Sequence, residues 1–147
     1  MKKYQFQLEK VLKVKTIELD QLLARLNEIR YEIKKIEDRI IELNEMEVKL
    51  HKEYLTKVQT YLMGTEIKQY NFQKQMIEYQ IKQLKQSLIE LKLREKNQLD
   101  KVVEKKKEEN MLKKLDEKLY SEYLGEANKK ENQRLDEMLV LKMIQKG

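Results

Sequence analysis

The stretch MGTEI, from Met63 to Ile67, contains one of only three glycines in a chain of 147 residues that has no proline. Glycine tolerates the left-handed conformation that ends a helix. Thr65 can cap a following helix, and Glu66 is favourable in its first turn. The stretch therefore predicts a short turn at about residues 63–66. The alternative is a glycine inside one continuous helix, at a cost of about 1 kcal/mol.

Apolar residues on both sides of this turn follow a heptad seam. Their spacing alternates between four and three residues, which keeps one stripe on one face of a supercoiled helix. In the first half the seam consists of Leu8, Leu12, Lys15, Leu19, Leu22, Leu26, Ile29, Ile33, Ile36, Ile40, Leu43, Glu47, Leu50 and Tyr54. In the second half it consists of Tyr70, Lys74, Ile77, Ile81, Leu84, Leu88 and Leu91, then more weakly of Glu95, Gln98, Val102, Leu112, Leu115 and Leu119.

Two seams separated by one turn predict an all-α fold, a long two-helix antiparallel coiled coil or α-helical hairpin. We expect a single coiled-coil domain over residues 1–147, with helices at about residues 3–62 and 67–144. Because charged pairs within one hairpin can satisfy the polar seam positions, the pattern favours a monomer over a parallel homodimer.

The position of the turn predicts which residues face each other across the hairpin. Lys15 falls near Asp116, and Glu95 falls near Lys34 and Lys35. These opposite charges could fix the register of the two helices.

The second helix is longer than the first and is expected to continue as an unpaired tail beyond about residue 125. Gly125 and Asn128 interrupt the start of this tail, and Asn128 and Glu131 are spaced like a helix cap and its partner. The tail carries apolar residues that the first helix is too short to cover: Leu135, Met138, Leu139, Leu141 and Ile144.

The composition excludes several classes of protein. Charged residues make up 39% of the chain, tryptophan is absent and glycine is rare, which is typical of long helices rather than of a compact core. Without cysteine there are no disulfides and no thiolate metal sites. The apolar runs are too short for a transmembrane span, and the N-terminus lacks a signal peptide, so we expect a cytoplasmic protein.

No catalytic signature is present, and we expect neither enzyme activity nor a cofactor or metal. The single histidine, His51, follows a seam residue among charged neighbours and is expected to be a solvated flanking residue. The isolated glycines form no phosphate-binding loop. Acidic residues are interspersed among the basic ones despite the net charge of +6, which argues against nucleic-acid binding.

Apolar residues away from the seam are candidates for docking. Phe72, Met76 and Tyr79 form an outward stripe just past the turn, with Gln83 next in line, and two aromatics beside a methionine are typical of a protein-binding patch. On the first helix, the outward positions include Ile41 and Val48. At the other end of the hairpin, a second cluster contains Tyr4 and Phe6 with Tyr120 and Tyr123, which also suits a lock that closes the open end.

Both ends of the chain carry a resemblance to a known family. The segment YQFQLEKVLKVKTIELDQLLARL, Tyr4 to Leu26, looks like the start of the flagellar FliJ family, and NKKENQRLDEMLVLKMI, Asn128 to Ile144, resembles the family's ending. The length and the central turn also fit, so the resemblance covers nearly the whole chain.

The resemblance implies a component of the flagellar type III protein export apparatus that is similar to the central stalk of rotary ATPases. It implies binding to the export ATPase (FliI) and to the export-gate protein (FlhA), escort of export chaperones, and a place at the cytoplasmic face of the inner membrane at the flagellar base. The gate-binding stripe then maps to Phe72, Met76, Tyr79 and Gln83, with Ile41 and Val48 on the first helix. The ATPase is expected to meet the open end and the tail: Tyr4, Phe6, Leu135, Met138, Leu139, Leu141 and Ile144.

Two alternatives belong to other classes. A generic structural or holdase-type coiled coil fits the same seams, although the short MGTEI turn leaves no room for the β-strands of a prefoldin. A small basic rod that binds nucleic acid would show a salt-dependent shift with DNA.

Overall fold

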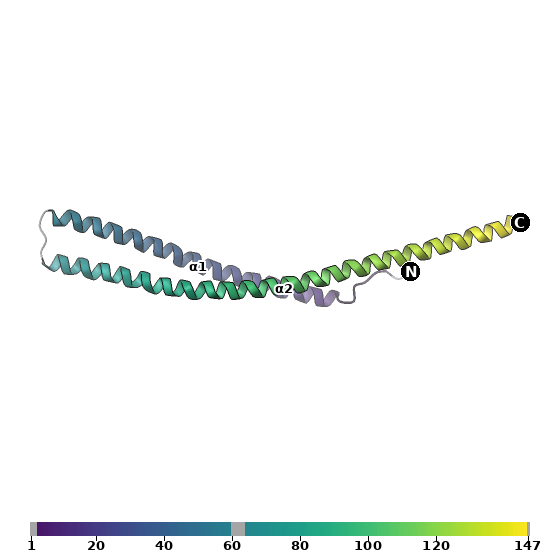
Figure 1. Cartoon of the computed structure of the whole chain (residues 1–147), viewed down its shortest axis with the longest axis horizontal. Coiled ribbons are helices and arrows are strands. Elements are labelled where there is room, and N and C mark those ends of the chain that lie inside the picture. The colour runs from purple at the N-terminus through teal and green to yellow at the C-terminus, as the bar shows by residue number, and fades with distance from the viewer. Residues whose placement is uncertain (1–2, 60–63, 147) are drawn as a thin grey trace. The chain divides into compact units, whose positions relative to one another are not determined.

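The computed structural model describes residues 3–59 and 64–146. Among these residues it contains two helices, α1 (Glu9–Val58) and α2 (Gly64–Lys146), and no strand (Figure 1). The two helices pack against each other, which confirms the predicted all-α hairpin.

The chain divides into two compact units, each built from part of α1 and part of α2. One unit is Leu22–Lys101, and the other combines Met1–Gln21 with Val102–Gly147. The two units differ in the chemistry of their seams, so each is described by itself.

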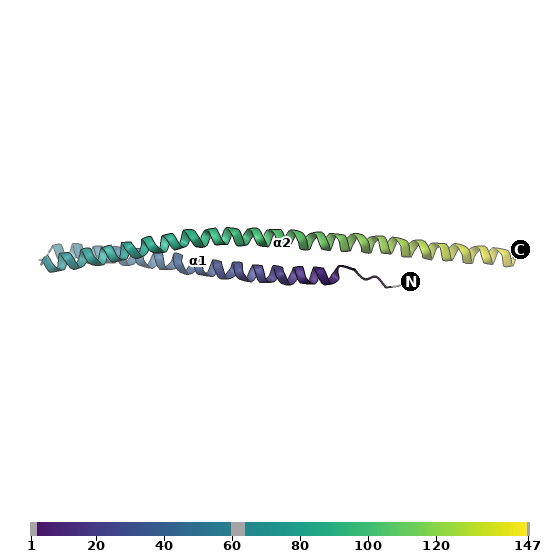
Figure 2. The same cartoon turned by 90° about the horizontal axis from the view of Figure 1, so that it is seen from below.

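The unit Leu22–Lys101 has an apolar seam. Ile29 and Ile33 of α1 form a buried cluster with Leu91 of α2, and Ile36 and Leu88 pack against it. Towards the turn, Tyr54 stacks on Tyr70 with ring centroids 4.0 Å apart. Residues with higher sequence numbers on α1 therefore contact residues with lower sequence numbers on α2, so the helices are antiparallel (Figure 2). The apolar seam residues that are buried in this unit are Leu26, Ile29, Ile33, Leu43, Ile81 and Leu91.

The other unit adds ion pairs between the helices to its apolar seam. Lys15 Nζ lies 3.0 Å from Glu108 Oε2, and Lys105 Nζ lies 2.6 Å from Glu18 Oε2. Its buried apolar residues are Phe6, Leu19 and Val102. Lys15 thus occupies a seam position of the kind that leucine and isoleucine fill in the unit Leu22–Lys101.

The ends of the helices differ from the prediction. Helix α1 begins at Glu9 instead of about residue 3. Residues 3–8 are not helical, and the Glu9 backbone N–H donates to the Phe6 carbonyl oxygen at 3.2 Å. Gly64 is already the first residue of α2, and no described glycine has a positive φ, so the predicted left-handed glycine is wrong. Residues 64–66 of the predicted turn are helical, and Met63 lies outside the described residues.

The predicted interruption of the tail is also wrong. Helix α2 runs without a break through Gly125 and Asn128 to Lys146. A glycine inside a helix costs only about 1 kcal/mol relative to alanine, which the many backbone hydrogen bonds of a long helix outweigh.

The register of the hairpin is shifted from the predicted one, by eight residues at Lys15 and by four or five at Glu95. Lys15 pairs with Glu108 and not with Asp116, and Glu95 pairs with Arg30 at 3.3 Å and not with Lys34 or Lys35. The cause is the turn: α1 ends at Val58 and α2 begins at Gly64, so the chain reverses several residues before the predicted place.

No helix in the described part of the chain combines the length and the apolar character needed to cross a membrane.

Candidate docking surfaces

The stripe just past the turn is exposed as predicted. Phe72, Met76 and Tyr79 have relative exposures of 64%, 44% and 59%, and Gln83 is exposed as well. The seam residue Ile77 beside them is only partly exposed. The stripe therefore contributes little to the folded core, although its large side chains present apolar surface.

Phe72 and Met76 line a surface groove of about 570 Å³ between the two helices. The α1 wall of this groove is formed by Arg39, Met46, Lys49, Leu50 and Glu53. Arg39, Met46 and Glu53 recur every seven residues at the position that flanks the seam on one side. An apolar Met46 between a basic and an acidic residue gives the groove an apolar floor with charged ends.

Ile41 and Val48 line a different groove. Its walls are formed by Ile41, Asn44, Glu45, Val48, Lys49 and Lys52. Residues 46 and 48 lie about 200° apart around a helix of 3.6 residues per turn, so Met46 and Val48 flank opposite sides of α1. The structure therefore brings Met46, which the sequence analysis missed, into the groove with Phe72 and Met76. Its flanking heptad position was the signal that could have identified it.

A cluster of three aromatic side chains, His51, Tyr54 and Tyr70, lies near the turn. His51 Nδ1 lies 3.0 Å from the Tyr70 hydroxyl, and Tyr70 stacks on Tyr54. His51 is exposed, in agreement with its predicted flanking position. Within the described residues, no group of three or more His, Asp or Glu side chains is placed to hold a metal ion.

Tyr4 packs on α2, and Phe6 is buried, so neither side chain faces solvent freely. The Tyr4 ring lies 5.2 Å from the Tyr120 ring and 5.6 Å from the Tyr123 ring, measured between centroids. Tyr4 also donates a hydrogen bond to the Asp116 carboxylate. Burial, this hydrogen bond and the negative charge of Asp116 raise the pKa of Tyr4 to about 12. The predicted cluster at the open end is thus present, with Tyr4 at its centre.

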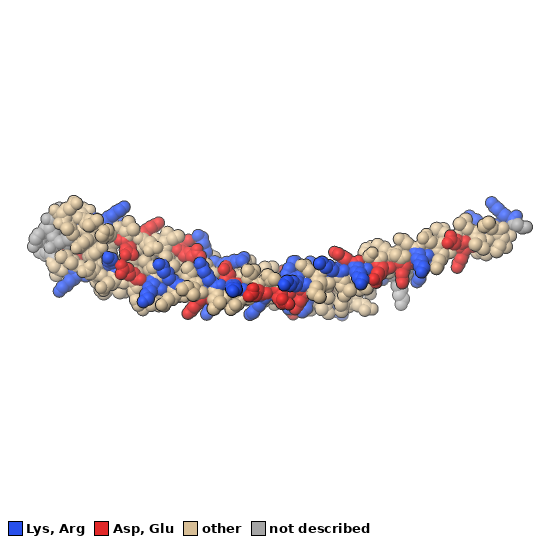
Figure 3. Space-filling view, viewed as in Figure 1, with Lys and Arg blue, Asp and Glu red and all other residues tan. Residues whose placement is uncertain are grey.

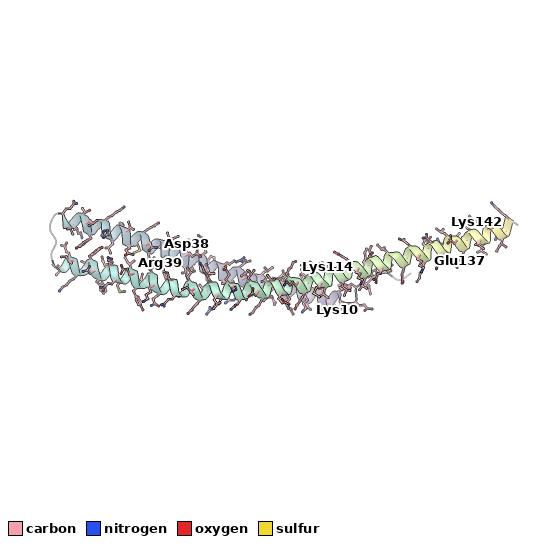
Figure 4. The ribbon with its side chains drawn as sticks, in the orientation of Figure 1. Lys10, Asp38, Arg39, Lys114, Glu137 and Lys142 are labelled. Carbon is pink, nitrogen blue, oxygen red and sulfur yellow. The ribbon has the colours of Figure 1, made fainter. Side chains whose placement is uncertain are left out.

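The tail of α2 is uncovered. Every residue from 128 to 146 is exposed, so no other described part of the chain packs on it. Glu137 and Lys142 project from this part of the helix (Figure 4). The predicted tail residues Leu135, Met138, Leu139, Leu141 and Ile144 are all exposed, as are Val140 and Met143. The structure thus separates the residues expected to meet the ATPase into a covered pair, Tyr4 and Phe6, and an uncovered tail.

Charge is distributed without a broad single-sign surface on the face seen in Figure 3, where basic and acidic side chains alternate. Many of these charges pair within one helix, as in Arg25–Glu28, Lys34–Asp38 and Arg134–Glu131. This pattern suits recognition by apolar grooves and by the tail better than recognition of a phosphate backbone.

The fold and these surfaces define a helical-hairpin coiled-coil protein with exposed apolar residues along both helices, among them the stripe beside the turn and the uncovered tail of α2. The sequence profile of the flagellar FliJ protein matches residues 4–147. The chain belongs to the flagellar FliJ family and is a component of the flagellar protein export apparatus. Searches of curated proteins and of solved structures found no match.

Proposed function

We propose that this protein is the stalk of the export apparatus: its α2 tail docks on the ring of the export ATPase FliI, and its groove beside the turn binds the export gate FlhA. In this proposal a single copy of the chain acts at the cytoplasmic face of the inner membrane at the flagellar base and escorts export chaperones. Family membership supports the setting, and the exposed surfaces support the assignment of partners.

One observation carries the ATPase assignment: the tail is apolar on several sides and is covered by nothing in the described chain. The run MLVLKMI, Met138 to Ile144, contains Lys142 as its only charged residue, and Leu139 and Ile144 are exposed by 58% and 69%. A helix that is apolar all round is normally buried. A ring encloses its central hole, so a helix inserted there is covered on all sides at once.

The charged residues of the tail fit the same proposal. Lys142 and Lys146 are the last basic side chains of α2, beyond the acidic Asp136 and Glu137. A basic tip would steer the tail towards acidic loops and would raise the rate of association more than the final affinity.

A pair of tail substitutions with a matched control tests the ATPase assignment. Leu135→Ser with Leu139→Ser removes two exposed leucines, 46% and 58% exposed, that lie four residues apart. Ile89→Ser with Leu93→Ser makes the same kind of change at exposed positions of α2, 69% and 60% exposed, away from the tail. We expect the tail variant to bind FliI at least about tenfold more weakly and to lose stimulation of its ATPase activity, and the control to keep both.

The opposite result would remove the tail from the docking surface. If the tail variant stimulates FliI as well as the unaltered chain does, the tail is not the docking element. If the unaltered chain neither binds FliI nor stimulates it but suppresses the aggregation of unrelated denatured proteins, the protein is a holdase-type coiled coil instead.

The gate assignment rests on the groove lined by Phe72 and Met76. Phe72, Met76 and Met46 are exposed where they line it, so a partner can cover them without opening the hairpin. Large aromatic and methionine side chains are enriched among the residues that dominate binding energy at protein interfaces.

A further inference from the structure

The first segment of the chain, residues 3–21, is attached to α2 through several polar contacts as well as through the ring of Tyr4. Lys15 pairs with Glu108, Glu18 pairs with Lys105, and Thr16 Oγ1 donates to Glu109 Oε2 at 2.9 Å. We call residues 3–21 the N-terminal latch. It coincides with the α1 side of the compact unit that begins Met1–Gln21.

The latch buries little apolar surface. Its fully buried apolar side chains are Phe6 and Leu19, while Leu8, at the first seam position, is 38% exposed. On the facing part of α2, Leu119 is 37% exposed. Burial of apolar surface is the main favourable term in folding, so the latch is held more weakly than the segment of α1 that carries Leu26, Ile29 and Ile33.

The charges that the latch covers on α2 are compensated within α2 itself. Glu109, only 2% exposed, accepts from Lys106 at 2.9 Å and lies 3.1 Å from Lys113 Nζ. Glu108 lies 3.3 Å from Lys105 on the same helix. If the latch leaves, each of these carboxylates keeps a lysine, so opening does not strand an unpaired buried charge, which would be the main electrostatic cost.

The surface beneath the latch lies on the same helix as the tail, and the polar stretch 128–134 separates the two. Val102 and Leu112 lie on the seam of α2, Tyr120 and Tyr123 contact Tyr4, and the uncovered tail follows from residue 128. Lys10 of the latch and Lys114 of α2 mark this part of the hairpin in Figure 4.

We propose that the N-terminal latch opens as one unit while Leu22–Lys101 stays paired, and that the closed latch is an autoinhibitory cover over α2. Opening uncovers a second stretch of α2, which includes Val102, Leu112 and Tyr123, and lengthens the surface available to the partner of the tail. That use of the surface rests on the proposed function, whereas the opening itself is a property of the isolated chain.

Amide hydrogen exchange of the full chain tests the opening. We expect amides of residues 12–21 to exchange at one common rate, at least about tenfold faster than amides of residues 26–43, because local opening has a lower free energy than global unfolding. The difference in exchange rate should grow at 1 M salt. The screening length falls from about 8 Å at 0.15 M to about 3 Å, which weakens the ion pairs that hold the latch.

A variant with an apolar seam provides the matched comparison. Lys15→Leu with Glu108→Leu replaces one polar pair by leucines and should slow exchange of residues 12–21 by about tenfold without changing residues 26–43. Lys34→Leu with Asp38→Leu removes an exposed pair of α1 within Leu22–Lys101, 3.0 Å apart, and should leave exchange of the latch unchanged.

Two results would overturn the proposal. A smooth gradient of exchange from Glu9 inwards, with no step near Leu22, would show ordinary fraying of a helix end. Equal exchange of residues 12–21 and 26–43 at both salt concentrations would show that the latch is a permanent part of the hairpin. Neither result depends on whether the tail binds FliI.

Discussion

Lys15 Nζ lies 3.0 Å from Glu108 Oε2, and the two side chains come from opposing helices within the seam. Lys105 lies 3.3 Å from the same Glu108 oxygen and also pairs with Glu18. Hydrogen bonds from Lys15 and Lys105 lower the pKa of Glu108. A carboxylate shared between two helices in this way selects one register, because sliding by a heptad would give Lys15 a different partner.

Reversing the charges of this pair tests the register. Lys15→Glu places a negative charge beside Glu108 and should lower the thermal midpoint by about 1–3 °C, since exposed ion pairs contribute modestly. Adding Glu108→Lys should recover most of the loss. Thermal unfolding followed by circular dichroism at low salt measures both changes, and the difference between the variants should shrink in 1 M salt.

Recovery by Asp116→Lys instead of Glu108→Lys would mean that the helices pair in the register that the sequence predicted. Asp116 accepts a hydrogen bond from Tyr4, so the Asp116→Lys single variant is measured as well, to account for the loss of that bond.

Truncating a buried leucine tests the apolar seam. Leu43, 1% exposed, is among the most buried side chains, so Leu43→Ala should lower the free energy of unfolding by about 2–4 kcal/mol. Leu93→Ala, at a leucine that is 60% exposed, should change it by less than about 0.5 kcal/mol. Urea unfolding at fixed temperature measures both. Equal losses would show that the faces of the helices are assigned wrongly.

The sequence could predict the seam because spacing alone decides which face of a helix meets its partner. Leu26, Ile33, Leu43 and Leu91 were all predicted on the seam, and all are buried. The heptad spacing also places Phe72 away from the seam, and Phe72 is exposed.

The register could not be predicted in the same way. Sliding one helix by a heptad keeps its apolar residues on the seam, so the apolar pattern does not distinguish one register from another. The predicted register depended on the position of the turn. That position was wrong because Gly64 begins α2 and does not end α1. The groove was predicted only in part. Phe72 and Met76 were identified as exposed. Which α1 residue lies beside them depends on which side of the α1 seam faces the groove, and Met46 was missed.

Acid should weaken the packing around Glu109. Hydrogen bonds from Lys106, Lys113 and Thr16 lower the pKa of Glu109 from 4.5 to about 2. A carboxyl group whose pKa is lower in the folded state stabilises that state above its ordinary pKa and loses this contribution as the pH falls. We therefore expect stability to decline as the pH falls from about 4.5 to about 2, and Glu109→Gln to reduce that decline.

Thermal midpoints measured across this pH range provide the readout, with Glu131→Gln as the control. Arg134 lowers the pKa of Glu131 too, but that pair lies three residues apart on the exposed tail and joins no second helix. Glu131→Gln should leave the acid decline nearly unchanged. An acid decline that is the same in the Glu109 variant and in the unaltered chain would show that ionised Glu109 does not stabilise the fold.

Substitutions of Met46 and of Val48 test which side of α1 binds the export gate. Both are exposed, 45% and 55%, but only Met46 lines the groove that contains Phe72 and Met76. Met46→Ala should weaken binding to FlhA by about fivefold or more, which is roughly 1 kcal/mol, because a central contact is truncated. Val48→Ala should leave the affinity unchanged within about twofold. Calorimetric titration of FlhA with each variant measures the difference. The reverse order of effects would move the gate site to the groove of Ile41 and Val48.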